Sequence, residues 1–152
     1  MNWNRKKSIL VTQILVGLLA AVLLTADIFG WKLCGYIMKK SVFLKGVEDA
    51  RLLLMITLYS CSAFAALILV RMMQLLVNLG KDRVFVRKNV SYLKRISVSF
   101  LVIALICVCS AAYFVPCIAA AAAALFLGAV VQVVKNVFSS AIAMKDELDL
   151  TV

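Results

Sequence analysis

Long runs without any charged side chain are the main pattern in this chain of 152 residues. Ser8–Ala26 and Leu52–Val70 each cover 19 residues, and Ile96–Val134 covers 39 residues. The hydrocarbon core of a bilayer is about 30 Å thick and requires about 20 apolar residues in a helix that rises about 1.5 Å per residue. The first two runs therefore predict one membrane span each. The third run predicts two spans, with the only proline, Pro116, near its middle.

These runs predict an all-α integral membrane protein, a single domain in which four antiparallel transmembrane helices form a bundle. We expect the spans at about 8–28, 52–77, 96–114 and 118–140, followed by a tail of residues 141–152. The second helix continues toward Gly80, which provides a left-handed helix end. In the fourth span, the run Ala119–Ala124 predicts burial against neighbouring helices, because small side chains let backbones approach closely.

The composition agrees with a membrane location. Hydrophobic residues make up 65% of the chain and the mean hydropathy is +1.06, whereas roughly half of a soluble domain is apolar. The net charge of +10 favours anionic lipid headgroups as partners. Residues 5–7 and the apolar run after them resemble a secretory signal. The run exceeds the roughly 7–15 residues of a signal core, so we expect it to remain as a span.

The basic residues are distributed unevenly between the two predicted sides of the membrane. If the N-terminus is inside, twelve of them lie on the cytoplasmic side and five in the outer first loop. Because short cytoplasmic loops collect Lys and Arg, this count predicts a multi-pass plasma membrane protein with both termini in the cytoplasm. The twelve residues are Arg5, Lys6, Lys7, Arg71, Lys81, Arg83, Arg87, Lys88, Lys94, Arg95, Lys135 and Lys145.

The segment between the second and third spans predicts a short basic amphipathic helix. At about 100° per residue its cations gather on one arc and its apolar residues on the other, which is typical of a helix lying in the headgroup plane. Membrane topology alone explains the charge but not this segregation. Direct nucleic-acid binding is not expected, because phosphate contacts need a positioned scaffold. The residues expected on anionic headgroups are Arg87, Lys88, Lys94 and Arg95.

The tail after residue 140 changes from apolar to acidic. It alternates acids with aliphatic residues at a period of two, which favours an extended strand that docks on a protein surface. The receptor would be basic, either the Arg87 and Lys88 region of this chain or a partner protein. A solvated, frayed end is the alternative. The residues expected to dock are Asp146, Glu147, Leu148, Asp149, Leu150 and Thr151.

Two motifs carry a resemblance to a known family. The tail reads KDELDLTV, and the inner loop carries Gly80, Phe85, Asn89, Leu93 and Ile96 in order. In these motifs and in topology the chain resembles the small four-span bacterial membrane proteins known as domain of unknown function 2975. The resemblance implies a location in the bacterial plasma membrane and no established activity. It also implies a partner, since genes of the family commonly lie beside small helix-turn-helix regulators of the Cro type.

The sequence offers little for catalysis. It contains no histidine and no phosphate-binding glycine loop, so we expect no enzyme, no cofactor and no metal. Asp27, at the outer edge of the first span, is interpreted as an interfacial residue that pairs with an outer lysine. Cys107 and Cys109 point about 200° apart on a helix and cannot form a redox pair. A structural disulfide between Cys34 and Cys117 is left open.

Two functions remain at this stage. The first is a non-enzymatic sensor or anchor that binds a small cytoplasmic helix-turn-helix regulator through the basic helix and the tail. The alternative is a small transporter or pore, which would form a homo-oligomer because four helices enclose no wide channel. Transporters place polar groups near the middle of the membrane. The uncharged candidates for that role are Gln13, Thr57, Ser60 and Ser62.

Overall fold

The structure is a computed structural model, and it describes residues 3–41, 49–81 and 86–150. No strand occurs in these ranges. Four of the helices contain apolar stretches long enough to cross a membrane, so the predicted all-α bundle of four spans is confirmed. The five helices are α1 (Trp3–Ile28), α2 (Gly30–Lys40), α3 (Ala50–Gly80), α4 (Arg87–Ser110) and α5 (Cys117–Leu150).

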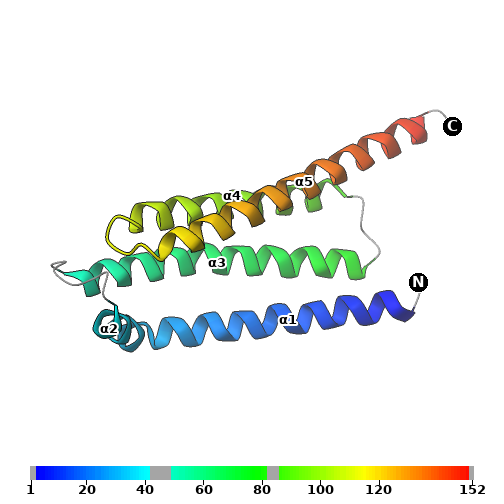
Figure 1. Cartoon of the computed structure of the whole chain (residues 1–152). Helices are drawn as coiled ribbons and strands as arrows, with labels where there is room; N and C mark the ends of the chain where they lie inside the picture. Colours follow the sequence, from blue (N-terminus) through cyan, green and yellow to red (C-terminus); the bar gives the residue numbers. More distant parts are fainter. Residues whose placement is uncertain (1–2, 42–48, 82–85, 151–152) are drawn as a thin grey trace.

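The helices pack in a chain of neighbours (Figure 1). α3 lies between α1 and α4, and α4 also packs along α5. Within the described residues, no Cα atom of α1 lies within 8 Å of one in α4 or α5, and no Cα atom of α3 lies within 8 Å of one in α5. The start of α1, the end of α3, the start of α4 and the end of α5 all lie at one end of the bundle (Figure 1). We call this the basic end, and the opposite end, where α2 lies, the α2 end.

Small side chains bring α4 and α5 together. Ala121 and Ala124 on α5 are buried, and the hydroxyl of Ser97 donates to the carbonyl of Gly128 at 3.0 Å. The predicted close approach of the fourth span is therefore observed on one face. The opposite face of α5 is exposed, as at Phe126. The span with the largest buried share is α4, not α5, because α4 packs along both α3 and α5, whereas α5 packs along α4 alone among the described helices.

A helix absent from the sequence prediction follows the first span. Residues 30–40 were expected to lie in an outer loop, and they form α2. Phe29 separates α2 from α1, and Gly30 lies close to α3, where an added Cβ would come within 3.0 Å of Leu58 Cδ2 and Tyr59 Oη. Only a glycine permits this approach without a shift of its neighbours. Cys34 is buried, whereas Trp31 and Tyr36 are exposed.

The position of α1 along α3 corrects the interpretation of Asp27. Ile9 lies beside Gly80, and the hydroxyl of Ser62 donates to Asp27 Oδ2 at 2.5 Å. α1 is thus displaced toward the basic end, and Asp27 lies opposite the middle of the charge-free run of α3. Its partner is Ser62, not an outer lysine. The second carboxylate oxygen, Oδ1, is buried without a hydrogen-bond partner.

The separate basic surface helix was a wrong prediction. α4 runs without interruption from Arg87 to Ser110, so the basic segment forms the first turns of the third membrane helix. Neither glycine nor proline occurs in this segment, and breaking the helix at Arg95 would leave backbone groups without hydrogen-bond partners. Phe85, part of the predicted motif, lies outside the described residues. Gly80 ends α3, but without the left-handed conformation that we expected.

The tail is helical, which corrects the prediction of an extended strand. α5 continues through Leu150, and Thr151 lies outside the described residues. The tail is rich in Ala, Met, Lys, Glu and Leu, which are strong helix formers. Propensity and continuation of an existing helix therefore outweigh the alternation of acids and aliphatics. α5 has 34 residues and α4 has 24, and at about 1.5 Å per residue α5 is about 15 Å longer.

Candidate functional site

The basic end of the bundle brings together cations from three helices. The charge-free runs of α3, α4 and α5 end at Arg71, Arg95 and Lys135. Arg71 and Arg95 line one groove between α3 and α4, and Lys135 lines a second groove with Lys94 between α4 and α5. Antiparallel packing therefore places the three transitions from apolar to basic sequence at a similar depth.

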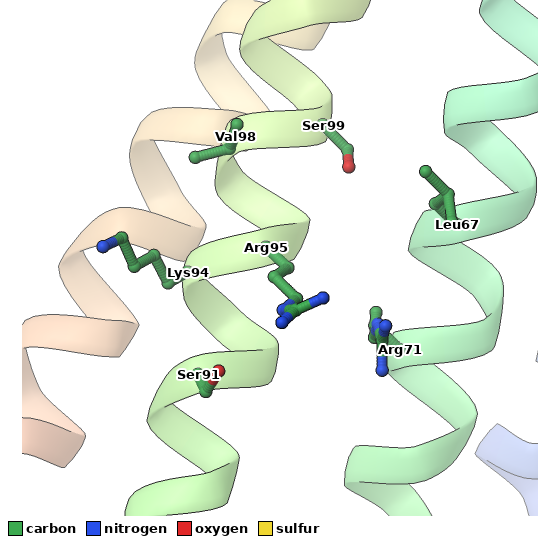
Figure 2. Close-up of a pocket in the computed structure, with 7 residues that line it drawn as sticks. All are labelled: Leu67, Arg71, Ser91, Lys94, Arg95, Val98 and Ser99. Carbon is green, nitrogen blue, oxygen red and sulfur yellow. The ribbon is translucent and has the colours of Figure 1, made fainter.

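The groove between α3 and α4 has a volume of about 390 Å³ and is lined by Arg71 and Arg95. We call it the arginine groove. Figure 2 shows the Arg95 side chain extending from α4 toward α3, where Arg71 lies on the side that faces α4, while Lys94 turns away toward α5. The hydroxyl of Ser99 points toward α3 (Figure 2). None of the lining residues is acidic. They are Leu67, Arg71, Ser91, Lys94, Arg95, Val98 and Ser99.

The two arginines lack an acidic partner among the described residues. Arg71 is partly buried, donates to Gln74 Oε1 at 2.8 Å and lies 5.8 Å from the centre of the Tyr92 ring. Arg95 is exposed and makes no hydrogen bond or ion pair to any residue in the described ranges. Two like charges that face one another repel, so the groove has a positive potential that favours an anion.

A buried amide pair fixes α3 against the start of α4. Asn78 Nδ2 donates to Asn89 Oδ1 at 2.9 Å, and Asn89 has no exposed surface. Leu93 and Ile96 are buried on the same side of α4. Three residues of the inner-loop motif thus form the internal face of α4, and the predicted separation of this face from the basic arc holds along the helix.

The end of α5 is tied to the start of α4. Asp146 Oδ2 accepts a hydrogen bond from Arg87 Nη2 at 3.0 Å, and Ile142 is buried one turn earlier on the same side of α5. Met144 and Leu148 lie on another face and are 58% and 68% exposed. The tail therefore has one side against α4 and one side that presents apolar groups outward. Asp149 and Leu150 are helical.

The α2 end contains a second polar cluster. Thr57 Oγ1 bonds to Ser110 Oγ at 2.9 Å and also to the Tyr113 hydroxyl, which joins α3 to α4 and the following turn. Arg51 stacks 3.5 Å from the centre of the Trp31 ring and donates to the Trp31 carbonyl. Burial raises the pKa of the Cys34 thiol, and the nearby Arg51 opposes this rise.

The cysteines do not form a disulfide in the structure, so the Cys34–Cys117 bond that was left open is not made. A different pair is close: Cys61 and Cys107 Sγ atoms lie 4.0 Å apart across α3 and α4. This pair was not predicted, because its proximity depends on how α3 and α4 are shifted along one another. No group of His, Cys, Asp and Glu in the described part of the chain has an arrangement suited to a metal.

The family model described as protein of unknown function (DUF2975) matches residues 44–152. The chain belongs to this family. The matched range contains α3, α4 and α5, and therefore the arginine groove, the amide pair and the tail; α1 and α2 precede it. The resemblance inferred from the two motifs is confirmed. No match was found among curated proteins or among solved structures.

Proposed function

We propose that this DUF2975 protein is a non-enzymatic membrane anchor or sensor that binds a small cytoplasmic helix-turn-helix regulator at its basic end. The observation that carries the proposal is the end of α5, which extends past the shorter α4 and keeps Met144 and Leu148 exposed. Two apolar residues four positions apart lie on one helix face, which is the pattern of a helix that enters a groove of a partner.

Charge supports the same kind of partner. Asp146 and Glu147 flank the exposed face, and a protein that binds DNA carries a basic surface to which acids are complementary. Asp146 is itself 49% exposed while paired with Arg87. In the proposal, a basic partner competes with Arg87 for this carboxylate, so partner binding and the contact between α4 and α5 are linked.

The proposed location is the bacterial plasma membrane, with both termini in the cytoplasm. The support is the count of twelve basic residues against five. Both ends of the described chain lie at the same end of the bundle (Figure 1), which is the arrangement that an even number of spans requires.

The test is co-purification of the full-length protein in detergent with a small helix-turn-helix protein encoded beside its gene. We expect the Met144→Ser/Leu148→Ser variant to lose at least tenfold in retained partner, because two buried apolar contacts disappear. Val137→Ser serves as the matched control, since Val137 is 62% exposed on the same helix but precedes the tail. Equal retention by the double variant would contradict the proposal.

A small oligomeric transporter is the second candidate, and one observation favours it. Asp27 and Ser62 form a hydrogen bond opposite the middle of the apolar part of α3, and an ionisable residue within the membrane commonly marks a transport pathway. α1 and α5 each have one long neighbour, so further faces are available to a second copy. Flux of protons or cations into vesicles, absent in Asp27→Asn, would support this candidate over the first.

A further inference from the structure

The arginine groove carries positive charge without an acidic partner among the described residues, and this charge has no role in the proposed binding of a partner at the tail. Arg71 and Arg95 converge from two helices with no carboxylate in the lining (Figure 2). Like charges held together at the edge of a low-dielectric region are unfavourable unless an anion lies between them. Guanidinium groups bind phosphate oxygens in a bidentate manner and are therefore suited to a phosphate group.

The depth of the groove indicates where such a phosphate would come from. Arg71 directly follows the charge-free run of α3, and Arg95 directly precedes that of α4. The arginines thus lie where the hydrocarbon core gives way to headgroups. Leu67 lies one turn further into the membrane on α3, and Val98 lies three residues further in on α4. A ligand in this groove has a polar end at the arginines and an apolar continuation toward the bilayer.

We propose that the groove binds the phosphate diester of an anionic glycerophospholipid, such as phosphatidylglycerol. Arg71 and Arg95 donate to the phosphate oxygens, and Leu67 and Val98 contact the first methylene groups of the acyl chains. Lipids that carry an additional ammonium group are disfavoured, because Lys94 at the rim adds a third positive charge. This site is separate from the exposed face at Met144 and Leu148, so the two proposals can fail independently.

Native mass spectrometry of the full-length protein tests the site. The protein in detergent is titrated with phosphatidylglycerol or phosphatidylethanolamine, and the fraction that retains lipid is measured. We expect about tenfold tighter retention of phosphatidylglycerol, and a loss of about this factor in Arg71→Gln/Arg95→Gln, because each cation near anionic lipid contributes roughly a few-fold or more. Lys81→Gln/Lys88→Gln removes the same charge from exposed residues outside the groove and should change retention by less than about twofold.

Two further arms keep the result interpretable. Arg71→Lys/Arg95→Lys keeps the charge but not the bidentate geometry, so retention should lie between those of the wild type and the glutamine variant. Inorganic phosphate and glycerol phosphate are added as competitors. Displacement of the lipid by either at equal concentration would show a site for soluble phosphate and overturn the lipid assignment. Equal losses in the arginine and lysine double variants would show that only general surface charge acts.

Discussion

Single buried polar residues determine how α3 and α4 align. Asn89 is fully buried, and its amide oxygen accepts from Asn78. Such a group is costly to bury unless its hydrogen bonds are made, so the pair disfavours any shift of one helix along the other. The bond lies within two turns of the arginine groove and on the same two helices, and it therefore helps to hold Arg71 opposite Arg95.

We predict that Asn89→Ala lowers the free energy of unfolding by about 2 kcal/mol, since the amide of Asn78 loses its acceptor inside the protein. Denaturation of the full-length protein in mixed detergent micelles measures this change. Lys88→Ala, at the exposed neighbouring position, is the control and should stay within about 0.5 kcal/mol of the wild type. A similar loss in both variants would show that Asn89 has no special role.

At the level of helices, backbone proximity decides which pairs form the stable unit. Gly128 allows α5 to approach α4 so closely that an added Cβ would lie 3.2 Å from the Cβ of Phe100. Gly17 on α1 has nothing within 4 Å of the same position. The two glycines look alike in sequence, and both lie in apolar spans. Of these two positions, only 128 requires a glycine, because only there does a neighbouring helix occupy the space of a side chain.

We predict that Gly128→Leu destabilises the protein by about 1–3 kcal/mol, because the larger side chain must push α4 and α5 apart. Gly17→Leu should be neutral or slightly stabilising, since leucine is the better helix former and meets open space. Thermal unfolding of both variants in the same detergent provides the comparison. Equal destabilisation by both substitutions would contradict the observed contact between α4 and α5.

The contact between α3 and α4 can be tested by cross-linking. We predict that a variant with cysteines only at positions 61 and 107 forms an intramolecular disulfide on mild oxidation with iodine, because the two Sγ atoms lie 4.0 Å apart. The control retains Cys61 and Cys109, which is exposed on α4 and faces away from Cys107. The bond is measured as the loss of thiols that react with an alkylating reagent under denaturing conditions. Efficient bonding of the control pair would contradict the alignment of α3 with α4.

For the whole molecule, the main question is which end faces the cytoplasm. We predict that a cysteine at Lys32, in an otherwise cysteine-free variant, reacts with an impermeant maleimide on intact cells, whereas one at Lys88 reacts only after lysis. Both positions are exposed, so the protein itself leaves both cysteines equally accessible to the reagent. The native Cys34 is unsuitable because it is buried. The reverse labelling pattern would place the basic end outside and exclude a cytoplasmic partner there.

The amino-acid pattern determined the number of spans and the family. A charge-free run of 19 residues can be assigned to the membrane without knowledge of its neighbours, because it crosses the hydrocarbon core without any charged side chain to desolvate. The basic segment and the acidic tail were also recognised as distinct segments. The basic segment is helical as predicted but continues into the third span, and the acidic tail is helical where an extended strand was predicted. Periodicity does not show whether a helix stops or continues.

Only the tertiary structure decided which distant residues meet. Asp27 lies at the edge of its own span in the sequence, but the packing of α1 along α3 places it beside Ser62, in the middle of the charge-free run of α3. The facing of Arg71 and Arg95 likewise follows from how far α3 and α4 are shifted along one another. That shift depends on contacts such as the amide pair and on the total fit of many side chains. These are properties of the packed helices and not of any single segment of sequence.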